Sequence, residues 1–371
     1  METIAFRDTI SCLDLKKQHQ QIKEEVFHAF EKVYDNAAFS GGTFVEEFEL
    51  RFAAFCGTKY AVGVNNGTSA LQLAIIALGI GKGDEVIVPA NTFIATAWGV
   101  SYSGATPVFV DCTPDTWQIN VNAVEERINA NTKAIIGVHL YGQPFDVTGI
   151  QELCAKHNLH FIEDAAQAQG AKFLDQPVGS FGELACFSFY PGKNLGACGE
   201  AGGITTNSDT IYKQLLSLRN HGSLTRYFHD EIGYNMRMGG LEAASLQVKL
   251  NYLPTWNLQR KSIAARYQSE IYNPKITMQA QPHWADSVYH LFVVCTNDRQ
   301  GLSEFLRKHH INAGLHYPVP CHLQKAYSHL QYESGACPNA EYLAQHCLSL
   351  PMYAELSDAE VTYIIDTVNS F

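Results

Sequence analysis

The chain has 371 residues, 46 % of them hydrophobic, so it is long enough to bury a full core and to divide into more than one domain. Its 37 acidic and 26 basic residues give a formal net charge of −11, which repels polyanions and argues against a nucleic-acid-binding surface. Residues Met1–Asp8 contain no basic segment followed by an apolar run, and no later apolar stretch reaches membrane-spanning length uninterrupted, so we expect a cytoplasmic protein without membrane contact.

The cysteines and histidines are scattered. Ten cysteines lie between Cys12 and Cys347 without a Cys-x-x-Cys pair, and the fifteen histidines form no His-Glu-x-x-His pattern. Such a distribution is typical of reduced, mostly buried thiols. We expect neither a disulfide framework nor a metal site.

Short apolar runs recur from Tyr60 to about Thr206, separated by turns of small residues and by longer helical or loop segments. Runs this short with connections this long predict buried strands of a mostly parallel sheet joined by crossover helices, and thus an α/β fold. The runs are Ala61–Val64, Glu85–Val88, Pro107–Val110, Ala134–Leu140, His160–Glu163, Ala185–Phe189 and Gly203–Thr205.

Beyond about Trp256 the pattern changes to that of a smaller α+β unit. We therefore expect a large domain over residues 1–255 and a small carboxyl-terminal domain over residues 256–371. The periodicity of the first 35 residues favours a helix that packs against the small domain. The elements expected here are a bridging helix over Leu241–Leu253, a strand over Tyr289–Cys295, helices over Gly301–His309 and Asn339–Leu348, and a last amphipathic helix within Pro351–Phe371.

The segment Asn65–Ala74 follows the first predicted strand with a turn of small polar residues that opens a helix. Free N–H groups at a helix start, aided by the hydroxyls of Thr68 and Ser69, can bind an anion. Simple capping of the helix by one of these two hydroxyls is the alternative. The spacing matches neither the phosphate loop of nucleotide triphosphatases nor the glycine-rich dinucleotide turn.

Asp164 ends the strand that begins at His160, at the edge where open α/β sheets bind ligands. A carboxylate there suits the pyridine nitrogen of pyridoxal 5′-phosphate (PLP), because it keeps that nitrogen protonated and the ring electron-accepting. Gln167, placed one helical turn further on, could donate to the phenolic oxygen of the ring. An Asp that caps a helix beside a surface Gln is the alternative.

Lys193 stands in a tight Pro-Gly turn directly after the strand that ends near Phe189. Such a turn holds a lysine at the sheet edge, as a Schiff-base lysine requires, and its amine pKa can fall enough for it to act as nucleophile and proton carrier. Ser188 would add a hydroxyl to the anion site. A single lysine in a turn is usually solvated surface, but an anion turn, an acid and a lysine in this order favour PLP chemistry.

The segments that carry these residues resemble the DegT/DnrJ/EryC1/StrS family of sugar aminotransferases. The matching segments are Asn66–Ala70, Glu163–Gln167, Phe187–Gly196 and Gly233–Ala243, and the similarity continues through His316–Gln324. The resemblance implies a type I PLP fold similar to aspartate aminotransferase, a homodimer with active sites at the subunit interface, and L-glutamate as amino donor.

The resemblance also implies roles by matched position. Lys193 would form the Schiff base with PLP, Asp164 would contact the ring nitrogen, and Gln167 would contact the phenolic oxygen. A related branch of the family carries histidine at the lysine position and performs dehydration, so Lys193 favours transamination. The remaining cofactor contacts would be Gly67, Thr68, Ser69 and Ser188 at the phosphate, Phe93 stacked on the ring, and Asn235 at the phosphate from the other subunit.

Two runs resemble the branch that aminates C3 of nucleotide-linked 3-keto sugars, namely Gly137–Pro144 and Gly314–Pro320. In the second run, His316 and Tyr317 would face the sugar opposite Tyr190, and Arg226 would bind the substrate diphosphate across the subunit interface. A dTDP-linked 3-keto-6-deoxyhexose is the first expectation for the substrate. A UDP-linked 3-keto-2-acetamido uronic acid and a 4-keto sugar are the alternatives.

Two rival functions fit the cofactor residues alone. One is another type I PLP enzyme, such as a desulfurase, a decarboxylase or an amino-acid aminotransferase. The other is a non-catalytic regulatory protein that retains PLP on the same fold. A half-reaction with glutamate separates these classes, because only an aminotransferase gives its cofactor the amino group.

Overall fold

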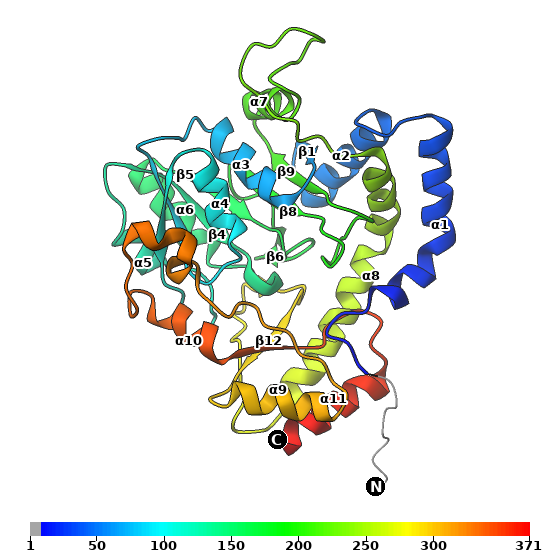
Figure 1. Ribbon diagram of the computed structural model, residues 1–371, viewed down its shortest axis with the longest axis vertical. Helices are drawn as coiled ribbons and strands as arrows, with labels where there is room; N and C mark the ends of the chain where they lie inside the picture. The colour runs from blue at the N-terminus through cyan, green and yellow to red at the C-terminus, as the bar shows by residue number, and fades with distance from the viewer. Residues whose placement is uncertain (1–8) are drawn as a thin grey trace.

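The computed structural model describes residues 9–371, so the expectation about Met1–Asp8 lies outside the described residues (Figure 1). Its centre is a seven-stranded sheet with the strand order β1-β9-β8-β5-β4-β2-β3. All seven apolar runs predicted as strands lie in this sheet, which confirms the α/β class. The strands are β1 (Tyr60–Val64), β2 (Glu85–Pro89), β3 (Thr106–Val110), β4 (Thr132–Val138), β5 (His160–Asp164), β8 (Leu184–Ser188) and β9 (Gly202–Thr206).

The sheet is mostly parallel, as predicted, with one strand reversed. β8, β5, β4, β2 and β3 run parallel to one another, whereas β9 is antiparallel to both of its neighbours, β1 and β8. Because β8 and β9 are antiparallel, a loop over residues 189–201 joins them instead of a crossover helix. This loop carries Lys193 across the edge of the sheet where β5 also ends.

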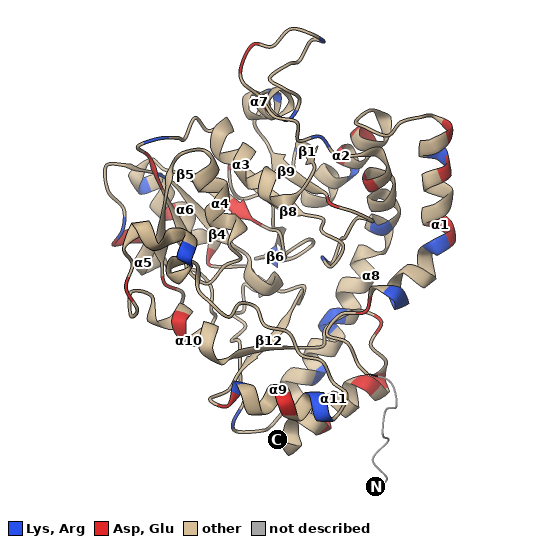
Figure 2. Ribbon diagram, viewed as in Figure 1, with Lys and Arg blue, Asp and Glu red and all other residues tan. Residues whose placement is uncertain are grey.

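Helices cover the sheet on both faces (Figure 1). The helices nearest the centre, α3 and α4, contain no charged residue and are buried along most of their length, as helices that are apolar on all sides generally are (Figure 2). The helices of this part of the chain are α2 (Thr43–Cys56), α3 (Gly67–Ala77), α4 (Ala95–Tyr102), α5 (Val121–Glu125), α6 (Val147–His157) and α7 (Asp209–Arg219).

α8 (Gly240–Glu270) runs from the sheet into the lower part of the molecule (Figure 1). It is much longer than the helix predicted over Leu241–Leu253 and continues through Pro254. Buried residues recur at helical spacing beyond this proline, from Trp256 to Tyr267, so packing outweighs the cost of the proline ring. The proposed domain boundary at residues 255/256 falls inside this helix.

The small unit is built on a second sheet, β10-β12-β13. The predicted strand is shorter than expected, and the helix expected over Asn339–Leu348 ends at His346, because the next residues pair with β12 as β13. The other two predicted helices are present. The elements are β10 (Thr277–Met278), β12 (Phe292–Cys295), β13 (Cys347–Leu350), α9 (Arg299–Lys308), α10 (Pro338–His346) and α11 (Asp358–Ser370).

The first described residues connect both units. α1 (Leu15–Asp35) packs along α8, with Ile22 and Val26 against Trp256, and the N–H of Ile10 donates to the carbonyl of His310 at 2.8 Å. Within residues 9–371, no helix is long and apolar enough to cross a membrane. The minor elements are β6 (Lys172–Phe173), β7 (Gln176–Pro177), β11 (Ala285–Asp286) and three 3₁₀ turns, η1 (Leu140–Gly142), η2 (Cys321–Leu323) and η3 (Lys325–Leu330).

An aromatic cluster under the sheet fixes the end of β8. Phe52 of α2 lies 4.9 Å from the ring of Phe187 and 5.0 Å from that of Phe189, and these two phenylalanines flank Ser188 in sequence. We predict that Phe52→Ala lowers the free energy of unfolding by about 3–5 kcal/mol, because it removes a buried ring and leaves a cavity. Denaturant unfolding measures this change. Tyr272→Ala, at an exposed position just beyond α8, is the control and should change stability by less than about 0.5 kcal/mol; equal effects of the two substitutions would contradict the role of Phe52 in the core.

Candidate active site

A cavity of about 670 Å³ lies between the carboxyl ends of the parallel strands and the small unit. It brings together most of the residues that the sequence singled out. The predicted residues that line it are Gly67, Thr68, Phe93, Asp164, Gln167, Ser188, Tyr190, Lys193, His316 and Tyr317. Such a convergence of polar groups in a concave site is what a small-molecule pocket requires.

One end of the cavity is the start of α3. The helix is capped by Asn66, whose Oδ1 accepts from the N–H of Ser69 at 2.8 Å, so the expected cap by Thr68 or Ser69 is wrong. Asn66 can do this because its extended backbone aims the short amide at the first turn. The side chain of Ser69 is buried and does not line the cavity, so its expected contact with the phosphate is not supported, whereas Thr68 does line it.

Ser188 lies against this helix start. A Cβ atom at Gly67 would be only 2.7 Å from the Cβ of Ser188, so glycine is needed for the contact. The first N–H groups of a helix have no intrahelical carbonyl partner, and Thr68 and Ser188, two residues with hydroxyl groups, line the cavity beside this helix start. The arrangement is suited to a phosphate.

Asp164 lines the cavity as the last residue of β5. Its Oδ2 accepts from the hydroxyl of Thr96 at 2.7 Å and its Oδ1 from the N–H of Ala166 at 3.1 Å. Burial raises the pKa of this carboxyl, and the two hydrogen bonds and Lys193 oppose the rise. A buried carboxylate in this position is stabilised by a cationic ligand atom.

Gln167 stands in a turn, not on a helix as predicted. Its Oε1 accepts from the N–H of Tyr141 at 2.6 Å and its Nε2 donates to the hydroxyl of Tyr317 at 3.0 Å. These bonds fix which end of the amide faces the cavity. The ring of Tyr317 lies 5.4 Å from that of Phe93, a half-exposed aromatic that also lines the cavity.

The loop that carries Lys193 is closed tightly. The N–H of Lys193 donates to the carbonyl of Tyr190 at 2.8 Å, and a Cβ at Gly196 would lie 2.3 Å from the carbonyl oxygen of Pro191. The buried ammonium of Lys249 donates to the carbonyl of Gly196 at 2.7 Å. Burial lowers the pKa of the Lys193 amine to about 8, against the opposing charge of Asp164.

His316 approaches from the small unit. Its Nδ1 lies 2.8 Å from the hydroxyl of Ser349, and burial, with a smaller effect of Lys193, lowers its pKa to about 4. The hydroxyl of Tyr141 donates to the backbone carbonyl of His316 at 2.6 Å. Only Val138 of the run around Tyr141 lines the cavity, and Tyr141 itself contacts the site through His316 and Gln167.

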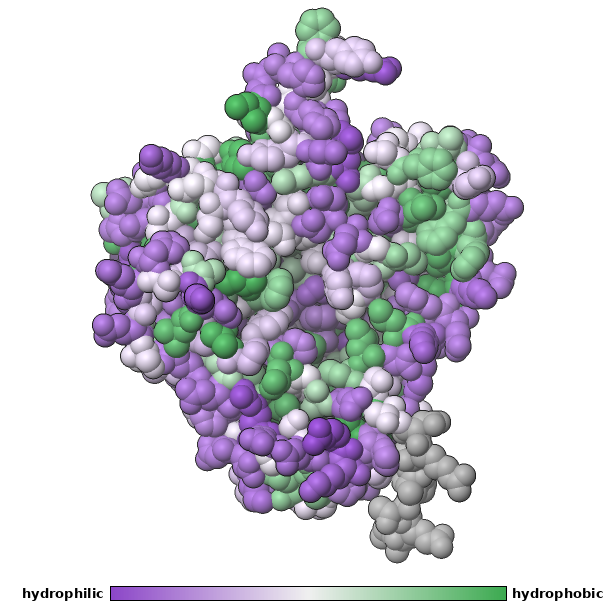
Figure 3. Space-filling model, in the orientation of Figure 1, coloured by the Kyte–Doolittle hydropathy of each residue, from purple (hydrophilic) through white to green (hydrophobic). Residues whose placement is uncertain are grey.

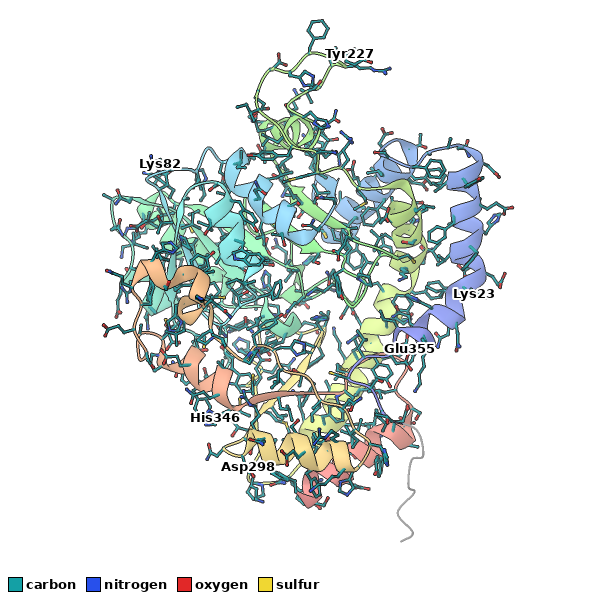
Figure 4. All side chains as sticks on the ribbon, in the orientation of Figure 1. Lys23, Lys82, Tyr227, Asp298, His346 and Glu355 are labelled. Carbon is teal, nitrogen blue, oxygen red and sulfur yellow. The ribbon has the colours of Figure 1, made fainter. Side chains whose placement is uncertain are left out.

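Asn235 and Arg226 do not line the cavity of their own chain. Asn235 is exposed, and its backbone pairs with that of Asn220. Arg226 lies on a loop that projects beyond α7, with its guanidinium 4.9 Å from the ring of Tyr227, which is labelled on that loop in Figure 4. Within one chain, neither residue can reach the cavity as placed.

Sequence reasoning missed several residues that line or shape the cavity. Arg260 and His290 line it, Thr96 holds Asp164, and Asn194 holds the lysine loop. Only Asn194 carries a local signal, because it follows Lys193 directly. The others reach the cavity through long-range packing.

The residues present fit PLP. A helix start with two hydroxyls suits its phosphate, a buried carboxylate suits its ring nitrogen, and an aromatic side chain can cover its ring. An amine of lowered pKa suits bond formation with its aldehyde. The residues that would hold it are Thr68, Phe93, Asp164, Gln167, Ser188 and Lys193.

Comparison with known proteins supports the same chemistry. A model of the family described as DegT/DnrJ/EryC1/StrS aminotransferase matches residues 20–369. A dTDP-3-amino-3,4,6-trideoxy-alpha-D-glucose transaminase of Streptomyces venezuelae is 41 % identical over 100 % of this chain and 98 % of its own length. A dTDP-3-amino-3,6-dideoxy-alpha-D-galactopyranose transaminase of Aneurinibacillus thermoaerophilus is 43 % identical over 98 % and 99 %. The crystal structure of S. venezuelae DesV in complex with a ketimine intermediate superposes with a TM-score of 0.96, at 41 % identity and 98 % coverage of both chains.

We predict that the cofactor-free protein captures added PLP on Lys193 with a rate constant that rises with pH around a midpoint near 8. Only the unprotonated amine attacks the aldehyde, and burial makes that form available above about pH 8 instead of above the usual lysine value of about 10.4. Stopped-flow absorbance measures the rate constant, with Lys193→Ala as the control. A midpoint above pH 10 would contradict the burial argument.

Proposed function

The chain belongs to the DegT/DnrJ/EryC1/StrS aminotransferase family and is a PLP-dependent aminotransferase. From this premise we propose that it transfers an amino group from L-glutamate to C3 of a nucleotide-linked 3-keto sugar. A dTDP-linked 3-keto-6-deoxyhexose is the first candidate substrate. The observation that carries the proposal is that Lys193 shares one cavity with the start of α3, which is suited to a phosphate, and with polar side chains that can form hydrogen bonds to a sugar.

Bound PLP supplies an electron-accepting ring that stabilises negative charge on a substrate carbon. Asp164 would keep the ring nitrogen protonated, because a buried carboxylate and a positive ring nitrogen stabilise each other's charge. Lys193 would remove the α-proton of glutamate as a neutral amine and hold it as an ammonium until it is returned. Glutamate would leave as 2-oxoglutarate, and the keto sugar would receive the nitrogen while Lys193 moves the corresponding protons in the reverse order.

Three side chains are suited to orienting the sugar. Tyr190, His316 and Tyr317 line the cavity around Lys193, and the lowered pKa of His316 and the raised pKa of Tyr317 leave both uncharged at neutral pH. Uncharged donors and acceptors suit hydroxyl groups better than carboxylates. Two relatives named as 3-amino sugar transaminases support C3 as the position of amination.

A shared dimeric site is part of the proposal. Arg226 and Asn235 would complete the cavity of the partner subunit, where the arginine would bind the substrate diphosphate. Apolar side chains are exposed on the same loop, at Leu224, Tyr227 and Phe228. Figure 3 shows further hydrophobic side chains gathered over α1 and α2, and exposed apolar patches of this kind mark interfaces.

A cytoplasmic location belongs to the same proposal. All ten cysteines are free thiols. Free thiols are maintained in reducing compartments.

We predict that the protein aminates 3-keto but not 4-keto nucleotide sugars, and that Tyr317→Phe lowers kcat/KM for the sugar about 5–150-fold. The estimate corresponds to one lost hydrogen bond to a buried substrate group, about 1–3 kcal/mol. A screen of dTDP- and UDP-linked keto sugars with glutamate as donor, read by mass spectrometry, tests the substrate. Amination of 4-keto sugars alone, or unchanged turnover in both Tyr317→Phe and His316→Ala, would contradict the assignment.

We also predict complementation between inactive chains. In a mixture of Lys193→Ala and Arg226→Ala chains, a hybrid dimer contains one site with an intact lysine and an intact arginine from the partner. Random mixing should therefore restore about one quarter of the sites. Activity and sedimentation of the mixture measure the effect, and the same test applies to Asn235→Ala. A fully active monomer would refute the shared site.

A further inference from the structure

His290 lines the cavity from the segment between β11 (Ala285–Asp286) and β12, and its ring is bound to the lysine loop. Its Nδ1 lies 3.2 Å from Oδ1 of Asn194, the residue that follows Lys193. The amide nitrogen of Asn194 donates to Oδ1 of Asn257 at 3.0 Å and to the carbonyl of Val288 at 3.1 Å. Since both donors of Asn194 are used, its Oδ1 must accept, and the proton of the imidazole is on Nδ1.

The tautomer follows from this bond. In a neutral imidazole with its proton on Nδ1, Nε2 carries a lone pair and can only accept. Within residues 9–371, Nε2 of His290 has no hydrogen-bond partner. Some side-chain polar atoms without a partner are fully buried, but Nε2 of His290 is not one of them. It is therefore open to the cavity that it lines.

The charged groups around His290 keep it neutral. Lys193 acts on it from the loop and Arg260 from α8, and each would repel a positive imidazole; His316 of the small unit would do so only when protonated itself. Burial and these neighbours lower the pKa of His290 well below its usual value. At neutral pH the ring accepts a hydrogen bond but does not store a proton.

In the structure, Lys193 has not found an acceptor. Its Nζ makes no hydrogen bond to the described residues, and each oxygen of Asp164, the acid that acts on it, already accepts one hydrogen bond, from Thr96 or from Ala166. An ammonium taken out of water needs a hydrogen-bond acceptor. Nε2 of His290 is an open acceptor in the same cavity, on a ring held by the next residue of the chain.

We propose that His290 is a positioning residue for Lys193, accepting a hydrogen bond through Nε2 from the lysine ammonium while the lysine holds the α-proton. The proton stays on Lys193 throughout, and His290 forms no covalent bond. The inference rests on the proposed function, in which Lys193 carries that proton. A sugar hydroxyl or water bound to Nε2 instead is the competing role.

Two substitutions separate the two nitrogens of the ring. His290→Asn keeps a donor near Nδ1 for Asn194 but has nothing at Nε2, whereas His290→Gln reaches the Nε2 position with an amide oxygen that accepts. The experiment is the pH dependence of PLP capture by the cofactor-free protein, which does not depend on turnover. His309→Asn, at a half-buried histidine bonded to the carbonyl of Phe305 and outside the cavity lining, is the matched control.

We expect the midpoint of capture to fall by about one pH unit in His290→Asn, because the ammonium loses a charged hydrogen bond. It should stay within about 0.3 unit of wild type in His290→Gln and in the control. An unchanged midpoint in His290→Asn would overturn the proposal. Equal shifts in both His290 variants, or a change confined to the KM of the sugar, would also overturn it. If His290→Asn does not fold, His290→Phe must show the same downward shift, and a wild-type midpoint there overturns the proposal.

The failure of the proposed function looks different. If the wild-type protein captures no PLP on Lys193, the assignment of the lysine is wrong and His290 has nothing to position. If the wild type captures PLP and only the variants behave alike, the function stands and the role of His290 falls.

Discussion

The site depends on one constraint, which is that an amine and a carboxylate are taken out of water in the same cavity. Burial lowers the pKa of Lys193 and raises that of Asp164, and each opposes the shift of the other. In a medium of low polarity, each charge must be stabilised by hydrogen bonds or by an opposite charge. Thr96 and Ala166 donate hydrogen bonds to the acid and, on our proposal, His290 accepts one from the lysine.

The fold delivers these groups with little freedom. Asp164 and Ser188 are the last residues of two adjacent parallel strands, so their spacing is set by the sheet. The lysine loop exists because β9 reverses direction and must be joined to β8 without a helix. Lys249 bonds to this loop at Gly196 and Asn257 bonds to it at Asn194. Both residues belong to α8, the helix that continues into the small unit.

The sequence predicts what is determined locally. Strand ends followed by Asp164, Ser188 and Lys193 can be read from short apolar runs, and all of these residues line the cavity. What it cannot predict depends on contacts at long range: β13 pairs with β12, more than fifty residues earlier in the chain, and the ring of His290 bonds to Asn194 of the lysine loop. The sequence predicts a helical turn at Gln167, whereas the structure has a non-helical turn there, in which the Gln167 amide bonds to Tyr141 and Tyr317.

The central claim is that Lys193 is the lysine that bonds PLP. Reduction of the PLP-loaded protein with borohydride, followed by proteolysis and mass spectrometry, tests it most directly, because reduction makes the bond between lysine and cofactor permanent. The account predicts a yellow protein whose phosphopyridoxyl label is found on the peptide containing Lys193. A label on another lysine, or a colourless protein that added PLP cannot restore, would contradict it.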